Sequence, residues 1–153
     1  VIIAGVEDLT VTGANGITIV TQTSIKIVDI SDVDMIVLPG GGAGTDILAT
    51  NETVQNMLKE FKQKNKFIAA ICAAPYALHT AGVLNQNYTC YPSFEKKIRE
   101  EGYESSKSVV IDGNIITSRG PGTAMCFALE IVKILTNEEI YNNVKNGLLA
   151  SSC

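Results

Sequence analysis

The chain has 153 residues, of which 46% are apolar and 18% charged, and its formal net charge is −4 with an isoelectric point near 5.0. This length fits a single domain, residues 1–153, with a sizeable core. The acidic balance, with no basic cluster beyond Lys96-Lys97, argues against nucleic acid or an anionic membrane as the main partner. No apolar run approaches the roughly 18 residues of a membrane span.

The first part of the chain predicts short strands. β-Branched runs at residues 1–4, 9–12 and 17–20 are typical of strands, and a glycine-containing turn separates the last two. Met35–Leu38 is an all-apolar run that ends on a glycine cluster at residues 39–44. Because open α/β folds place their sites at the carboxyl ends of parallel strands, this loop is a candidate site wall, with a simple flexible turn as the alternative.

The middle of the chain alternates between helix and strand patterns. Residues 53–64 carry the i, i+3, i+4, i+7 spacing of an amphipathic helix, and Phe67–Ile71 is a short apolar strand. A helix is predicted at 73–81, with Pro75 in its first turn. A short strand at 88–91 and a small charged helix at 94–101 follow.

The last part predicts a hairpin and two helices. Strands at 109–111 and 115–117 flank Asp-Gly-Asn, a strong hairpin signal. Helices are expected at 123–135 and 138–146, before a frayed tail at 147–153. Since strands alternate with helices after residue 35, we predict an α/β fold with a largely parallel sheet.

Cys72 is the main candidate for chemistry. It lies on the turn between the predicted strand 67–71 and helix 73–81. The partial positive charge of a helix N-terminus favours a nucleophilic thiolate there. The competing interpretation is a buried structural cysteine, since free Cys is among the most buried residue types.

The neighbours of Cys72 constrain what it can do. The only histidine, His79, lies seven residues further along the same predicted helix, roughly 10 Å along its axis. It cannot serve as the base of a Cys-His dyad, so peptide hydrolysis is disfavoured. If the glycine loop faces the turn, the backbone N–H groups of Gly41 and Ala73 are natural anion donors.

Two further residues are weaker candidates. Arg119 precedes a predicted helix N-terminus, where an anion can bind, although a solvated arginine is an equal alternative. Tyr91, beside Cys90, can line the same edge of the sheet or simply pack. No cysteine pair or histidine has metal-ligand spacing, and we expect no metal and no cofactor. The scatter of Cys72, Cys90, Cys126 and Cys153 favours free thiols in a reducing cytoplasm, with a pairing left open.

Three motifs taken together resemble one family. They are V-L-P-G-G-G-A-G at 37–44, A-A-I-C-A-A-P at 69–75 and T-S-R-G-P-G-T-A at 117–124, and the stretch 89–98 is also similar. In this order and spacing they resemble the ThiJ/PfpI superfamily, specifically the branch of the Parkinsonism-associated deglycase. The resemblance runs from about residue 1 to about residue 149.

The resemblance implies a flavodoxin-like three-layer α/β sandwich with a β-hairpin, usually a homodimer. It places the nucleophile at Cys72, the anion-stabilising amides at Gly41 and Ala73, and Arg119 and Pro121 near the dimer interface. It also implies that Tyr91 replaces a histidine found in some relatives. The activity implied is that of a glyoxalase or deglycase acting on methylglyoxal or its adducts, without a cofactor.

The beginning of the chain departs from the family pattern. Relatives start with a strand, a turn bearing a glutamate that hydrogen-bonds the cysteine, and a helix, whereas residues 1–5 match the second strand better. Glu7 is followed by no helix-length segment before the next strand patterns. We therefore expect an N-terminally incomplete domain whose sheet either has unpaired edges or is completed by another chain.

Three hypotheses remain open from the sequence. The first is a Cys72-dependent glyoxalase or deglycase that acts on reactive carbonyls or glycated groups. The second is a peroxide-sensing or chaperone protein in which Cys72 is oxidised, since an exposed thiolate is prone to oxidation. The third is an inactive homologue with a structural Cys72.

Overall fold

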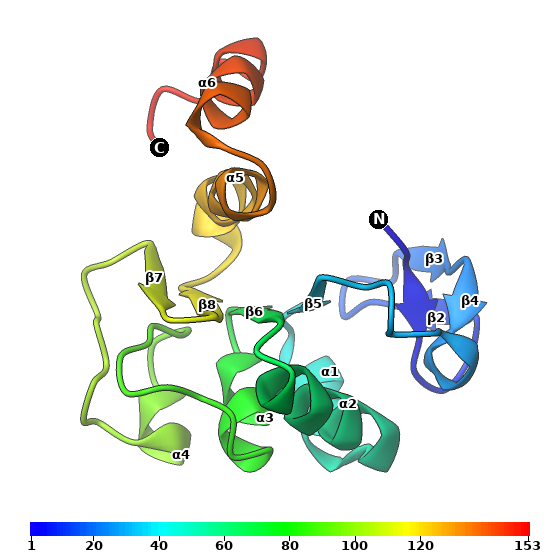
Figure 1. Ribbon diagram of the computed structural model, residues 1–153. Helices are drawn as coiled ribbons and strands as arrows, with labels where there is room; N and C mark the ends of the chain where they lie inside the picture. The colour runs from blue at the N-terminus through cyan, green and yellow to red at the C-terminus, as the bar shows by residue number, and fades with distance from the viewer.

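The main sheet has four strands in the order β5-β6-β8-β7 in the computed structural model, which describes residues 1–153 (Figure 1). The strands β5 (Met35–Leu38), β6 (Phe67–Ile71) and β8 (Ile115–Ser118) are parallel, and β7 (Val109–Asp112) pairs antiparallel with β8. The register places Ile68 opposite both Ile36 and Ile115. The predicted strands at 35–38 and 67–71 and the predicted hairpin are confirmed.

Helices cover both faces of this sheet, so the molecule has three layers (Figure 1). The central strand β6 alternates between the two faces, as the period of two requires. Ile68 and Ala70 join the larger core cluster on one face, whereas Ala69 joins a smaller cluster with Ile116 and Phe127 on the other. All five side chains are buried, which explains why β6 is apolar throughout.

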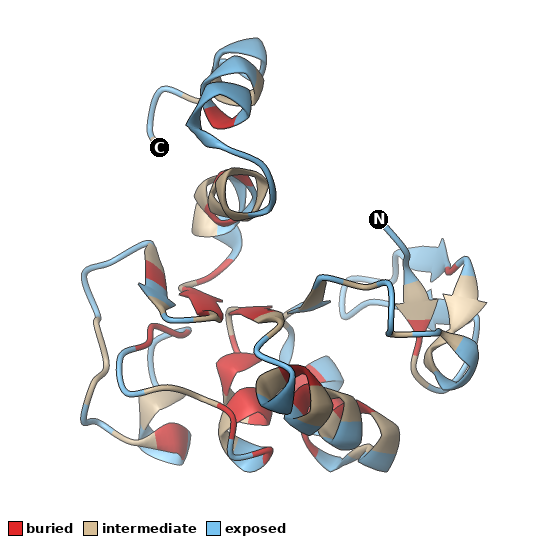
Figure 2. Cartoon of the chain, viewed as in Figure 1, coloured by how far each residue is buried: buried red, intermediate tan, exposed pale blue.

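The first face carries α1 (Gly42–Thr50), α2 (Glu52–Gln63) and α3 (Pro75–Thr80), with α4 (Glu95–Ile98) beside them. The second face carries α5 (Ala124–Leu135), against which α6 (Glu138–Gly147) packs. In α2, Val54, Leu58 and Phe61 are buried, as the sequence periodicity predicts. Figure 2 shows buried residues gathered where the helices of the first face meet the sheet. No helix has both the length and the apolar character needed to cross a membrane.

The N-terminal segment lies outside the main sheet. The short strand β1 (Ala4–Gly5) pairs in parallel with β4 (Thr23–Ser24), and β2 (Thr10–Thr12) forms an antiparallel hairpin with β3 (Thr18–Val20). A 3₁₀ turn, η1 (Ile25–Ile27), follows. The outer edge of β5 has no strand partner, and a largely apolar groove of about 780 Å³ separates it from β1 and β2.

Several predicted boundaries are wrong. The glycine cluster is not entirely loop, because α1 begins at Gly42 and extends over residues that the sequence gives no helical pattern. Residues 88–91 form a single bridge from Tyr88 to Tyr103 and not a strand. The helix expected at 94–101 spans only Glu95–Ile98. The α/β prediction itself, a flavodoxin-like sandwich with a mainly parallel sheet, is confirmed.

Candidate active site

Cys72 lies on a sharp elbow between β6 and α3. Its φ angle is +67°, in the left-handed region that side-chain-bearing residues rarely adopt. Two long-range hydrogen bonds hold this conformation: the Cys72 N–H donates to Ser118 O at 2.9 Å, and the Tyr91 N–H donates to Cys72 O at 2.8 Å. Both backbone polar groups of the strained residue are therefore fixed by other segments, an arrangement typical of functional sites.

Gly40 lies directly against the Cys72 side chain. A Cβ atom at Gly40 would be 2.6 Å from Cys72 Cβ and 3.2 Å from Cys72 Sγ. The loop after β5 therefore approaches the Cys72 side chain more closely at Gly40 than a residue with a side chain could. The thiol itself is half-buried, so it is held in place and still accessible.

Two backbone amides near the sulfur have no acceptor within the chain. The Gly41 N–H follows directly after Gly40, and the Ala73 N–H follows directly after Cys72; neither makes an intrachain hydrogen bond. Ala73 is only 2% exposed, and unpaired N–H groups in buried residues are uncommon. Both free donors therefore belong to residues that follow directly after the contacting pair Gly40 and Cys72, one in the loop after β5 and one in the turn before α3.

Tyr91 and Cys90 lie on the segment that bonds to the elbow, and they differ in environment. Tyr91 is 47% exposed, and its ring lies 3.3 Å from the position of a Cβ at Gly120. Cys90 is fully buried against Tyr88 and Ile98. Burial, followed by the negative charge of Glu95, raises the pKa of the Cys90 thiol to about 12. Cys90 therefore stays protonated at neutral pH and is not a competing nucleophile.

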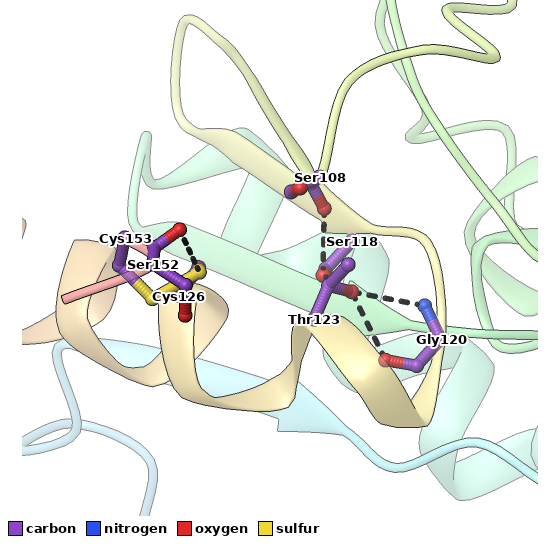
Figure 3. The surroundings of a disulfide bond; sticks show 7 residues. All are labelled: Ser108, Ser118, Gly120, Thr123, Cys126, Ser152 and Cys153. Atoms are coloured by element: carbon purple, nitrogen blue, oxygen red, sulfur yellow. Dashed lines mark hydrogen bonds between the residues drawn. A yellow bond between two sulfur atoms is a disulfide. The ribbon is translucent and has the colours of Figure 1, made fainter. Parts of the chain in front are cut away.

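The turn after β8 is joined to the elbow through Ser118, which accepts from the Cys72 N–H. Arg119 is half-buried and its side chain makes no salt bridge, while Pro121 is exposed at the start of the 3₁₀ turn η2 (Pro121–Thr123). Thr123 Oγ1 lies 2.7 Å from Ser118 Oγ and accepts from the Gly120 N–H at 3.1 Å (Figure 3). This network fixes the residue whose carbonyl holds the Cys72 N–H.

The other polar residues stay apart from the thiol. His79 is in the last turn of α3, and no hydrogen bond joins it to Cys72. No group of three or more His, Cys, Asp or Glu side chains is placed to hold a metal ion. Glu7 is exposed on the rim of the groove beside β1.

Sequence reasoning missed three features of this region. It did not single out Gly40, which makes the close approach to the Cys72 side chain. It gave Ser118 no role of its own, although the position at the carboxyl end of a parallel strand next to β6 was a usable signal. The sequence favoured free thiols and left a pairing open, and the structure has the pairing: Cys126 and Cys153 form a disulfide, which ties down the tail that was expected to fray. Only Cys72 and Cys90 are free.

Comparison with known proteins gives consistent results. Residues 1–134 match the DJ-1/PfpI family. The protein dj-1beta of Drosophila melanogaster is 38% identical over 159 residues, covering 97% of this chain and 84% of the relative. Glutathione-independent glyoxalase DJR-1.2 of Caenorhabditis elegans is 37% identical, covering 97% of this chain and 80% of the relative.

Solved structures agree with this result. The crystal structure of Drosophila DJ-1beta superposes with a TM-score of 0.92 over 97% of this chain and 81% of that one. Toxoplasma gondii DJ-1 in an oxidized form, 32% identical, gives a TM-score of 0.91 over 97% of this chain and 82% of that one. Sequence and structure therefore agree that the chain belongs to the DJ-1/PfpI family.

Proposed function

We propose that this chain is a cofactor-independent glyoxalase or deglycase that acts on methylglyoxal or its adducts, with Cys72 as the nucleophile. The observation that carries the proposal is the half-buried thiol on a strained elbow, beside two amides without acceptors. A relative with 37% identity over nearly the whole chain is named as a glutathione-independent glyoxalase, which supports this activity.

The chemistry begins with addition of sulfur to the aldehyde carbon of methylglyoxal. An S–C bond forms, and the carbonyl π electrons move to oxygen, where the Gly41 and Ala73 N–H groups donate to the developing anion. The hydrogen on carbon 1 then moves with its bonding electrons to carbon 2 while the carbon 1 oxyanion becomes the thioester carbonyl. The new carbon 2 alkoxide takes a proton from water, which gives a lactoyl thioester. Water then cleaves the S–C bond, so methylglyoxal and water yield lactate and the free thiol.

The surrounding residues have supporting roles in this proposal. Arg119 carries the one uncompensated positive charge on the turn after β8, so it attracts the anionic product or a carboxylate of a glycated substrate. Tyr91 is 47% exposed on the segment hydrogen-bonded to the elbow, where its ring can contact a bound substrate. Pro121 fixes the backbone that follows Arg119.

The test is lactate formation from methylglyoxal. The wild type is compared with Cys72→Ser and with Cys153→Ser, a control that removes a sulfur from the tail. We expect Cys72→Ser to fall to the buffer rate and Cys153→Ser to keep wild-type turnover. Equal rates for the wild type and Cys72→Ser would refute the proposal. Lactate formation is measured in separate assays with free methylglyoxal and with its adduct to a model thiol. The comparison distinguishes glyoxalase from deglycase activity.

A second candidate function is peroxide sensing or chaperone activity governed by Cys72 oxidation. It is favoured by the accessible thiol and by the oxidized form of the Toxoplasma gondii relative. Two peroxide molecules convert the thiol to a sulfinic acid and release two waters. After mild peroxide treatment, peptide mass spectrometry should place two added oxygens on Cys72. Their equal distribution between Cys72 and Cys90 would contradict selective sensing.

We also propose a cytoplasmic homodimer built from a single domain, residues 1–153. The reducing compartment rests on the free thiols of Cys72 and Cys90, whereas the Cys126–Cys153 disulfide counts against it. Exposed apolar side chains suit a surface covered by a partner, and they gather on the β2–β3 hairpin at Val11, Ile19 and Val20. Light scattering during size-exclusion chromatography tests the dimer, and cell fractionation tests the compartment. A monomer at micromolar concentration would contradict the proposed dimer.

A further inference from the structure

The end of the chain is tied back to the start of α5 by the disulfide between Cys126 and Cys153 (Figure 3). The two cysteines are 27 residues apart, with Cα atoms separated by 5.2 Å, inside the range in which a disulfide forms without moving the backbone. The closed loop contains most of α5 and all of α6. The bond therefore determines where the C-terminal tail, residues 148–153, lies.

The hydrogen bonds of the tail do not hold it against α5. Its backbone hydrogen bonds are local: Leu149 N–H to Asn146 O, Ala150 N–H to Lys145 O, and Ser151 N–H to Leu149 O. The Ser152 carbonyl oxygen lies 4.0 Å from Cys126 Sγ, but a disulfide sulfur has no hydrogen to donate, so no hydrogen bond joins the tail to α5 there. Leu149 is 87% exposed. Breaking the S–S bond thus leaves the last residues with little to hold them near α5.

Small thiols can reach this disulfide. Both cysteines are half-buried, and they line an open surface hollow of about 380 Å³. The hollow is lined by one positive side chain, Lys107, and one negative side chain, Glu130. Ser108 and Ile111 line it from the edge of the sheet. Accessible disulfides are the ones that exchange with thiols.

We propose that Cys126 and Cys153 form a reversible redox couple, a second redox site distinct from Cys72, which tethers and releases the C-terminal tail. The reductant is a low-molecular-weight thiol such as glutathione. Its thiolate attacks one sulfur of the disulfide, forming a mixed disulfide and freeing one cysteine. A second thiol then attacks the mixed disulfide, so two thiols become one small disulfide and both cysteines are reduced. Oxidation runs through the same steps in reverse.

The experiment uses the full chain carrying Cys72→Ser, so that the proposed catalytic thiol neither exchanges with the couple nor affects the result. The protein is equilibrated with mixtures of reduced and oxidised glutathione, starting from each redox state. Iodoacetamide then traps free thiols, and peptide mass spectrometry locates them. We expect Cys126 and Cys153 to be alkylated together or not at all, with the same fraction reached from both directions.

The state of the tail is measured separately by hydrogen exchange of residues 148–153. We expect faster exchange in the reduced protein than in the oxidised protein. Cys126→Ser should show fast exchange under both conditions, whereas Cys90→Ser should keep the redox dependence. The proposal is overturned if the two cysteines are alkylated independently, if the disulfide resists a large excess of glutathione, or if exchange in the tail is the same in both states. None of these outcomes bears on turnover at Cys72.

Discussion

The contact between Gly40 and Cys72 makes a sharp prediction for Gly40→Ala. The φ angle of Gly40 is not in the left-handed region, so an alanine there has no backbone penalty, and its effect is purely steric. The new Cβ would be 2.6 Å from Cys72 Cβ and 3.1 Å from Ile71 O, whereas ordinary contacts begin at 3.4 Å. Either the loop after β5 or the Cys72 side chain must move by somewhat less than 1 Å.

The displacement is expected to affect reactivity more than folding. Overpacking of this size costs about 1–3 kcal/mol of the free energy of unfolding. A misplacement of about 1 Å at a reacting group can lower the rate about 10²-fold. We therefore expect Gly40→Ala to stay folded while both its methylglyoxal turnover and its rate of iodoacetamide labelling at Cys72 fall by a factor on that order.

The matched control is Gly44→Ala, in the first turn of α1. Nothing lies within 4 Å of a Cβ at Gly44, and alanine is a better helix former than glycine by up to about 1 kcal/mol. This variant should keep wild-type turnover and labelling, with equal or higher stability in urea denaturation. If Gly40→Ala also kept wild-type turnover, labelling and stability, the steric argument for how the elbow is held would be wrong.

Three predictions concern stability. Leu58→Ala should lower the free energy of unfolding by about 2–5 kcal/mol in urea, because Leu58 is fully buried; the exposed Leu148→Ala is its control, and equal effects would contradict the assigned core. Asn51→Ala should cost about 1 kcal/mol, because Asn51 Oδ1 caps α2 by accepting from the Val54 N–H at 3.1 Å; a glycine at position 51 should cost less. The pKa of Cys90 is raised from 9.0 to about 12, so the unfolded chain ionises first and stability should fall between pH 9 and 12. Cys90→Ala should flatten that decline, and an unchanged slope would count against the buried thiol as its source.

The parts of the fold that the sequence predicts well are those with a local cause. Met35–Leu38 and Phe67–Ile71 are short apolar runs in strands covered by helices, and their ends coincide with a change in composition. The helix Glu52–Gln63 has both a periodic apolar stripe and an Asn cap. The hairpin at 109–118 follows from its turn residues. In each case propensity and tertiary packing favour the same conformation.

The failures occur where tertiary contacts override local preference. Gly42 and Gly44 are weak helix formers, yet α1 includes both, because its buried residues Thr45, Leu48 and Ala49 pack against the rest of the first face. Residues 88–91 look like a strand, but β7 and not this segment pairs with β8, so Tyr88 is left with one bridge. The pairing of Cys126 with Cys153 depends on how α6 folds back onto α5, which spacing alone does not reveal.

In the candidate site, too, the sequence predicts the features with a local cause and misses those that depend on tertiary contacts. That Cys72 lies between a strand and a helix follows from its neighbours in sequence. Tyr91 is hydrogen-bonded to the elbow, and Gly41 and Arg119 directly follow Gly40 and Ser118, which contact it, while the roles of these residues and of Ala73 stay predictions. The direction of the thiol depends instead on a positive φ angle, which costs about 1–3 kcal/mol for a residue with a side chain.

Two hydrogen bonds to residues far away in the sequence offset this backbone strain. Ser118 accepts from the Cys72 N–H, and Tyr91 donates to the Cys72 carbonyl. Because both partners act through the backbone, the identity of their side chains carries no trace of the contact in the sequence. A local pattern can therefore locate a nucleophile, but its orientation depends on strand order and register, which only the folded chain contains.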